Sequence, residues 1–345
     1  MTIPTAREAS DTAAIPFPVL IADIGGTNVR FSLLSEPGAP LDVFETVATG
    51  DFPGFSEAAR HAVLERTGQR PRAVLMAIAG PANAVPMRLT NAHWVIDPAE
   101  IAATLSLSTV IVFNDFEALS LSLPALGDDQ LMRIGDGVSQ PRKPRLVLGP
   151  GTGLGVAALH YGEPYFIPLP GEGGHMTIGP ETARDFEIWP HLERVGGRIS
   201  GEALLSGNGL ARLYRGIAAA AGEDRTACRS GADVTARAQA GEALADEAVS
   251  LFLTYLGRYA GNLALVFLPE GGVYIAGGIA PRLAARFAES GFRNAFEAKE
   301  PHAAILKAMP TYLVTEPRPA IAGMATFAEM PERFVVDLAG RRHDR

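Results

Sequence analysis

Short apolar runs joined by glycine-rich turns recur along this chain. Residues 19–22 and 146–148 are two such runs, and each leads through glycines and a threonine into a second strand-like stretch, residues 29–34 and 156–159. Short apolar runs bounded by turn residues are typical of buried strands. The same pattern predicts further strands at residues 43–47, 73–79, 87–89, 94–96, 110–113, 165–169, 273–276 and 312–314.

Helices are predicted between these strands. Ser56 suits the N-cap of a helix that runs to Thr67, where Gly68 ends it. Pro98 opens a short helix, and Pro281 lies in the first turn of another. Other helices are expected at residues 116–123 and 320–330, and a helix-rich block at residues 181 to about 267.

The unit of strand, turn, strand and helix occurs twice. This repetition predicts an α/β fold of two lobes around a central cleft, with a helix-rich insertion in the second lobe. A chain of 345 residues also exceeds one typical domain. The polar stretch 127–144 is expected to follow the lobe boundary, and the charged tail 340–345 to be frayed. The expected parts are a flexible leader at residues 1–16, a small lobe at residues 17–125 completed by about 316–335, and a large lobe at residues 126–315.

Composition and charge narrow the possible partners and location. With 47% hydrophobic and 20% charged residues, the chain is expected to fold around sizeable cores. Its net charge of -8 argues against nucleic acid or an anionic membrane as a partner. Cys228 is the only cysteine, so an intramolecular disulfide and a multi-cysteine zinc site are excluded. We expect a cytoplasmic protein, since the first 18 residues lack the apolar core of a signal peptide and no apolar run approaches the ~20 residues that span a bilayer.

The first glycine turn is a candidate phosphate site. Asp23 ends a strand and is followed by Ile24, Gly25, Gly26 and Thr27. Glycines let phosphate oxygens approach backbone N–H groups, and the threonine adds a hydroxyl donor. The carboxylate would orient hydrated Mg²⁺. The alternative is a simple β-hairpin, for which Gly-Gly is a standard turn pair.

The second glycine turn contains Gly151, Thr152 and Gly153. It does not match the dinucleotide-binding spacing G-x-G-x-x-G, because Ala158 stands where the last glycine would be. No Gly-Lys pair occurs in the chain, so there is no Walker A loop either. A phosphate bound here would depend on backbone amides and hydroxyls.

Asn114 and Asp115 form the best catalytic candidate. An aspartate that leaves a buried strand can accept the proton of a hydroxyl during phosphoryl transfer, and a neighbouring amide can bind a polyol. The alternative is an Asn-Asp cap on the helix that follows.

Two further glycine-rich segments carry candidate ligand-binding residues. Glycines surround Glu172 and His175, which could converge on one small ligand, whereas Glu202 could equally cap a helix. Gly277 and Gly278 end a strand and leave room for a base and ribose, or simply connect strand to helix.

Taken in order, these motifs resemble the bacterial glucokinase family of the hexokinase and actin-like superfamily. The similarity spans roughly residues 19–325. The matching segments are Ala22-Asp23-Ile24-Gly25-Gly26-Thr27-Asn28, Asn114-Asp115-Phe116, Gly151-Thr152-Gly153-Leu154-Gly155, Leu169-Pro170-Gly171-Glu172-Gly173-Gly174-His175, Ser206-Gly207-x-Gly209-Leu210-x-x-Leu213-Tyr214-Arg215 and Ile275-Ala276-Gly277-Gly278-Ile279-x-Pro281-Arg282.

The resemblance implies two actin-like (RNase H-like) lobes and ATP-dependent phosphorylation of the glucose 6-hydroxyl, the entry step of glycolysis. Asp115 would be the general base, and Mg²⁺ would arrive with ATP, with Asp23 reaching it through water. A homodimer is also implied. Glucose would be bound by Asn114, Asp115, Glu172, His175 and Glu202. ATP would be bound by Asp23, Ile24, Gly25, Gly26, Thr27, Asn28, Gly151, Thr152, Gly153, Gly277 and Gly278.

Other functions fit the same motifs. A kinase for another hexose or amino sugar would need the same scaffold, and a sugar sensor would bind without phosphorylating. A polymer-forming actin-like ATPase would have no use for Glu172 and His175. The sequence departs from the family pattern at residues 176–180, which leaves the shape of that loop open.

Overall fold

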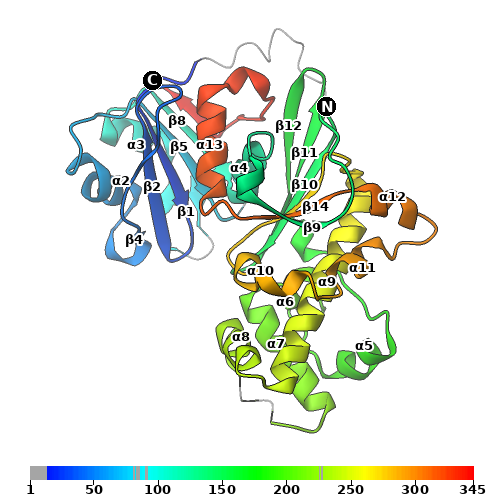
Figure 1. Ribbon diagram of the computed structural model, residues 1–345. Coiled ribbons are helices and arrows are strands. Elements are labelled where there is room, and N and C mark those ends of the chain that lie inside the picture. Colours follow the sequence, from blue (N-terminus) through cyan, green and yellow to red (C-terminus); the bar gives the residue numbers. More distant parts are fainter. Residues whose placement is uncertain (1–13, 81, 83–85, 90–91, 225, 227) are drawn as a thin grey trace. The chain divides into compact units, whose positions relative to one another are not determined.

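Figure 1 shows the computed structural model of the chain, which describes residues 14–80, 82, 86–89, 92–224, 226 and 228–345. The chain forms two compact units of strands and helices, and the predicted α/β class is confirmed. Most of the expected leader lies outside the described residues. Unit 1 consists of the described residues of Met1–Leu126, Leu159–Pro170 and Pro317–Arg345, and unit 2 of those of Gly127–Ala158 and Gly171–Glu316.

Unit 1 is built on a mixed sheet. Its strands are β1 (Val19–Ile24), β2 (Asn28–Leu34), β3 (Asp42–Val43), β4 (Val47–Ala48), β5 (Ala73–Ile78), β8 (Thr109–Asn114) and β15 (Arg342–Asp344). They follow the order β15-β8-β5-β1-β2-β3, and β4 also pairs with β2. β1, β5 and β8 run parallel to one another. Every residue of β5 is buried, as expected for a continuous apolar run inside a parallel sheet.

The helices of unit 1 confirm most predicted positions. They are α2 (Phe55–Ala59), the π-helical η2 (Arg60–Leu64), α3 (Pro98–Leu105), α4 (Asp115–Ser122), α13 (Pro319–Glu329), and the short η1 (Thr49–Asp51) and η7 (Pro331–Arg333). A separate two-stranded sheet, β6 (Met87–Arg88) and β7 (Val95–Ile96), follows β5 and precedes α3 along the chain. The predicted cap at Ser56 is wrong: Gly54 is the N-cap, because the buried Phe55 already belongs to the helix and Ser56 is buried in its first turn.

Helices α4 and α13 lie side by side in direct contact (Figure 1). A Cβ on Gly323 of α13 would overlap the carbonyl oxygen of Ala118 on α4, so a glycine is required there. Phe327 of α13 also packs edge-on against Phe113 of β8, with ring centroids 5.3 Å apart. The helix that begins at Asp115 is therefore held firmly against the body of unit 1.

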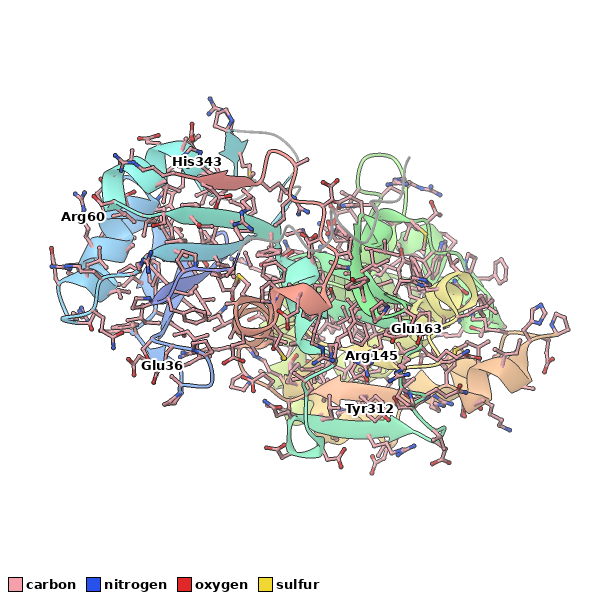
Figure 2. The ribbon with its side chains drawn as sticks, turned by 90° about the horizontal axis from the view of Figure 1, so that it is seen from above. Glu36, Arg60, Arg145, Glu163, Tyr312 and His343 are labelled. Carbon is pink, nitrogen blue, oxygen red and sulfur yellow. The ribbon has the colours of Figure 1, made fainter. Side chains whose placement is uncertain are left out.

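The last strand corrects the prediction of a frayed tail at residues 340–345. The structure has β15 there, antiparallel to β8, and Figure 2 shows His343 on this edge strand. Thr109 of β8 donates a hydrogen bond to the Asp344 carboxylate at 2.9 Å. Arg341, just before the strand, is buried. Long-range pairing orders this segment, and its charged local composition gives no sign of that pairing.

The second sheet has six strands and lies mainly in unit 2, although its residues 159–162 and 165–170 belong to unit 1. Its strands are β9 (Leu131–Gly135), β10 (Arg145–Pro150), β11 (Leu154–Gly162), β12 (Tyr165–Gly171), β13 (Val273–Ile275) and β14 (Thr311–Val314), in the order β12-β11-β10-β13-β14-β9. β9 lies in the polar stretch 127–144, for which no strand was predicted. Met132 and Ile134 of β9 pack against the core, and the strand pairs antiparallel with β14. In the sequence, the alternation of apolar Met132 and Ile134 with polar residues is too short to stand out from the polar segments on either side.

A helical block separates β12 from β13, which confirms the predicted helix-rich insertion. Its long helix α9 buries Phe252, Tyr255 and Tyr259 in the core of unit 2. In the part of the chain that the structure describes, no helix is both long and apolar enough to cross a membrane. The helices of unit 2 are η3 (Asp128–Gln130), η4 (Gly173–His175), α5 (Ala183–Ile188), η5 (Trp189–His191), α6 (Gly201–Leu204), α7 (Gly207–Ala220), α8 (Gly231–Gln239), α9 (Ala243–Phe267), η6 (Ala280–Leu283), α10 (Ala284–Phe287), α11 (Phe292–Glu297) and α12 (Ala303–Ala308).

Candidate functional site

The first glycine turn joins β1 to β2 as a hairpin in unit 1. The Gly25 amide donates a hydrogen bond to the Asn28 carbonyl at 2.9 Å, and the Gly26 carbonyl accepts one from the Thr49 hydroxyl at 3.2 Å. Gly25 does not have a positive φ, and a Cβ there would make only an ordinary 3.4 Å contact. Thr27 is exposed. Neither backbone conformation nor packing requires glycine at position 25, so its small size leaves the turn accessible to a ligand.

Asp23 is the last residue but one of β1 and is half-buried, while the neighbouring Ile24 is fully buried. The Arg30 guanidinium on β2 lies 3.0 Å from the Asp23 carboxylate, whose side chain is 20% exposed. Burial raises the pKa of Asp23 above its usual range, and Arg30 offsets part of that increase. A single partly accessible carboxylate suits a contact to a water of hydrated Mg²⁺ better than a closed metal site. Among the described residues, no group of three or more His, Cys, Asp or Glu side chains could hold a metal ion directly.

Asn114 caps helix α4, as the alternative interpretation of this motif predicted. Its Oδ1 accepts hydrogen bonds from the amides of Phe116 at 3.0 Å and Glu117 at 3.1 Å, and its Nδ2 donates to the Gly80 carbonyl at 3.1 Å. Asp115 is the first residue of the helix and is half-buried. Its Oδ1 accepts from the Phe116 amide at 2.9 Å. The cap therefore gives the Asp115 carboxylate a defined place at the end of β8.

Three of the predicted sugar-binding side chains come together in unit 2. His175 Nε2 lies 3.6 Å from a Glu172 oxygen, and His175 Nδ1 lies 4.0 Å from a Glu202 oxygen. All three side chains keep at least a third of their surface exposed. Carboxylates accept hydrogen bonds and an imidazole can both donate and accept, so this cluster offers several partners to the hydroxyls of a sugar.

Tyr259 of α9 holds the loop that carries this cluster. Its hydroxyl donates to the Gly173 carbonyl at 2.5 Å and lies 3.3 Å from the Met176 carbonyl. Burial raises the pKa of Tyr259 to about 12, so the hydroxyl stays a donor at neutral pH. A Cβ on Gly174 would overlap the Leu154 carbonyl oxygen. Sequence reasoning missed Tyr259, because an aromatic residue in a long apolar helix looks like ordinary core.

The second glycine turn adjoins the same cluster. The Glu202 carboxylate accepts a hydrogen bond from the Leu154 amide at 3.1 Å, and a Cβ on Gly153 would overlap that carboxylate. The Gly151 carbonyl accepts from the Gly207 amide at the start of α7 at 2.9 Å. No atom beyond its own chain neighbours lies within 4 Å of a Cβ built on Gly151. Hydrogen bonds to Glu202 and Gly207 thus hold this turn in place, while the space beside Gly151 is open and the neighbouring Thr152 is exposed.

Gly277 and Gly278 lie beside this second turn. Gly277 has φ +82°, and a Cβ there would lie 2.5 Å from the Pro150 carbonyl oxygen. The Ile279 amide donates to that same carbonyl at 3.2 Å. Gly278 is exposed, with open space where a Cβ would point. The structure therefore brings two of the three glycine segments predicted to bind nucleotide, residues 151–153 and 277–278, side by side in unit 2.

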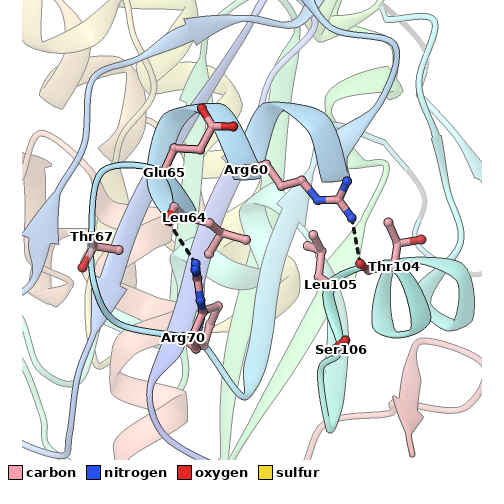
Figure 3. A pocket seen from close by; sticks show the side chains of 9 residues that line it. Arg60, Leu64, Glu65, Thr67, Arg70, Thr104, Leu105 and Ser106 are labelled. Carbon is pink, nitrogen blue, oxygen red and sulfur yellow. Dashed lines mark hydrogen bonds between the residues drawn. The ribbon is translucent and has the colours of Figure 1, made fainter.

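A separate pocket of about 790 Å³ lies in unit 1 and includes none of the predicted site residues. Figure 3 shows that both of its arginines are already engaged: Arg60 donates to the Thr104 carbonyl at 2.9 Å, and Arg70 donates to the Leu64 carbonyl at 3.0 Å. The candidate site therefore rests on the glycine turns and the side chains beside them, not on this pocket.

Comparison with known proteins identifies the family of the chain. The glucokinase family model matches residues 20–331. A glucokinase of Sinorhizobium medicae is 47% identical over 337 residues, which cover 98% of this chain and 99% of that protein. A glucokinase of Agrobacterium fabrum is 47% identical over 97% of this chain and 98% of its own length. The crystal structure of a glucokinase from an Antarctic psychrotroph is 33% identical, covers 89% of this chain and 98% of its own, and has a TM-score of 0.80.

These matches extend through both units and include every motif on which the expected resemblance was based. They also agree with the actin-like fold class expected from the sequence. The chain belongs to the glucokinase family.

Proposed function

We propose that this protein transfers the terminal phosphoryl group of ATP to the 6-hydroxyl of D-glucose, with Asp115 as the general base. The observation that carries the proposal is the Glu172–His175–Glu202 cluster, which the Glu202 hydrogen bond joins to the second glycine turn. One carboxylate thus belongs both to a polar cluster suited to sugar hydroxyls and to a turn suited to phosphate. Membership of the glucokinase family supports the same reaction.

In the proposed reaction, the sugar hydroxyl attacks the terminal phosphorus of ATP. The bond from glucose O6 to phosphorus forms, the bond from phosphorus to the leaving oxygen of ADP breaks, and the hydroxyl proton passes to Asp115. Asn114 caps α4 and keeps one N–H of its amide for a sugar oxygen. Glu172, His175 and Glu202 bind the other hydroxyls and orient the ring.

ATP is bound in this proposal by backbone amides and hydroxyls, because the chain has no Walker A lysine. The donors are Gly26, Thr27 and Asn28 of the first turn and Thr152 and Gly153 of the second. Gly25 and Gly151 donate their amides within their own turns and keep the approach to the phosphates open, and Gly277 and Gly278 leave room for the adenosine. Bound Mg²⁺ would neutralise charge on the phosphates. Asp23 would hold it through water.

The proposal also includes a cellular location and an oligomeric state. A cytoplasmic location suits a kinase that uses ATP and has one, buried, cysteine. A homodimer rests on the family resemblance alone, and light scattering after size-exclusion chromatography would test it.

The proposal is tested by following product formation from glucose, ATP and Mg²⁺ with glucose-6-phosphate dehydrogenase as the coupling enzyme. Mannose, fructose and amino sugars are tested in parallel by ADP release. Turnover that strongly favours glucose supports the proposal. Turnover on a different sugar would support the same phosphoryl-transfer mechanism and would show that glucose is not the preferred substrate. Glucose binding without turnover on any sugar would support a sensor instead.

A further inference from the structure

Arg341 and Glu117 form a buried ion pair inside unit 1. The guanidinium makes two hydrogen bonds to the carboxylate, Nη1 to Oε2 at 2.6 Å and Nη2 to Oε1 at 3.2 Å. Glu117 is 1% exposed and Arg341 8%. Arg341 also donates to the Asp337 carbonyl, and its own carbonyl accepts from the Val112 amide of β8 at 3.0 Å. Both the backbone and the side chain of this arginine are therefore fixed.

The Glu117 carboxylate has a second partner at the start of α4. Its Oε2 accepts a hydrogen bond from the Asn114 backbone amide at 3.2 Å, while the Asn114 side chain accepts from the Glu117 amide at 3.1 Å. These two bonds form a capping box. Asp115 lies between the two residues of this box. The direction in which the backbone presents Asp115 thus depends on where the Glu117 carboxylate is held.

We infer that Arg341 is a positioning residue for phosphoryl transfer, which holds Asp115 in place through Glu117 and the Asn114 cap. This inference rests on the proposed role of Asp115 as general base. Displacing a reacting group by about 1 Å can lower the rate of the chemical step about 10²-fold. A residue that only stabilised the fold would change the unfolding temperature and leave kcat alone.

The chemistry of the pair explains why an arginine occupies this position. A guanidinium matches both oxygens of a carboxylate with a planar pair of donors. Removing it alone leaves the Glu117 charge buried without its partner, which is strongly unfavourable. The carboxylate would then move toward water and release the Asn114 amide. Replacing both side chains by glutamine removes both charges and avoids that penalty.

The test compares kcat, the KM values for glucose and ATP, and the thermal unfolding midpoint among full-length variants. Arg341→Gln breaks the ion pair, and the double variant Glu117→Gln/Arg341→Gln removes both charges. Arg342→Gln is the matched control, since that arginine is the next residue along the chain and pairs with Asp344 at 2.7 Å on β15. Asp115→Asn is assayed in parallel.

We expect Arg341→Gln and the double variant to lower kcat at least about tenfold while both KM values stay within about twofold. Arg342→Gln should keep the wild-type kcat. A wild-type kcat in folded Arg341→Gln would overturn the inference. If Arg341→Gln does not fold, a wild-type kcat in the double variant would overturn it. An equal loss in Arg342→Gln would also overturn it. Full turnover by Asp115→Asn would defeat both the proposed role of Asp115 and this inference. If kcat falls in Asp115→Asn but stays at the wild-type value in both Arg341 variants, only the inference is defeated.

Discussion

The Glu202 carboxylate accepts a hydrogen bond from the Leu154 amide at 3.1 Å. Through this bond a side chain of the polar cluster also supports the glycine turn at residues 151–153. His175 lies within 4.0 Å of the same carboxylate. In unit 2 the groups proposed to bind sugar and those proposed to bind phosphate are therefore joined at Glu202, so replacing Glu202 should affect both substrates.

Glu172 should act mainly in sugar binding. Replacing Glu172 by Gln removes a charged acceptor beside His175, and a hydrogen bond to a charged group contributes about 1.5–3 kcal/mol. The KM for glucose should rise about 10- to 100-fold while the KM for ATP changes little. Initial rates against each substrate measure this, with exposed Glu163→Gln as the matched control. An unchanged KM for glucose would contradict the role assigned to Glu172.

Gly151 and Gly277 should respond differently to the same substitution. Gly151→Ala places a Cβ in open space, so the unfolding midpoint should stay at the wild-type value while the KM for ATP rises about tenfold through blocked access to the turn. Gly277→Ala forces an alanine to φ +82° and a clash with the Pro150 carbonyl, which should cost at least about 1–2 kcal/mol of unfolding free energy. Differential scanning calorimetry and ATP titration separate the two effects. Equal stability losses would contradict this account of the turns.

Tyr259 should support the sugar-binding loop through its hydroxyl. Tyr259→Phe removes the donor to the half-buried Gly173 carbonyl, and a hydrogen bond of this kind contributes about 0.5–1.5 kcal/mol. We expect a lower unfolding midpoint together with a several-fold higher KM for glucose. Tyr312→Phe on β14 is the matched control. A variant with lower stability and unaltered KM for glucose would show that Tyr259 serves the fold alone.

Magnesium should be required for turnover and not for the fold. In the proposed reaction the ion enters with ATP, and Asp23 contacts it through water. Excess EDTA should abolish activity, added Mg²⁺ should restore it fully, and the circular dichroism spectrum should not change. Undiminished turnover in EDTA would exclude a mechanism that uses MgATP.

Local sequence patterns predict much of this fold. β1, β5, β8 and β10 are short apolar runs bounded by turn residues, so periodicity alone places them. β9 and β15 are missed because each depends on pairing with a distant strand, β14 or β8. The capping preference places Asn114 correctly, whereas Ser56 fails as a cap because packing of Phe55 starts the helix earlier.

The candidate site is predicted less completely than the fold. Motifs identify Glu172, His175 and Glu202, but only the structure places Glu202 against both His175 and the second glycine turn. Tyr259 and Arg341 carry no motif. Tyr259 bonds to the Gly173 carbonyl and Arg341 pairs with Glu117, and partners so distant in the sequence cannot be deduced from neighbouring residues.

The most direct test of the central claim compares Asp115→Asn with the wild-type protein in glucose 6-phosphate formation and in glucose binding by calorimetry. Asparagine keeps the size of the side chain and cannot accept the hydroxyl proton. We predict that kcat falls at least about 10²-fold while the dissociation constant for glucose stays near the wild-type value. Exposed Asp42→Asn on β3 is the matched control and should behave as wild type. Wild-type turnover by Asp115→Asn would remove Asp115 from the mechanism and contradict the account.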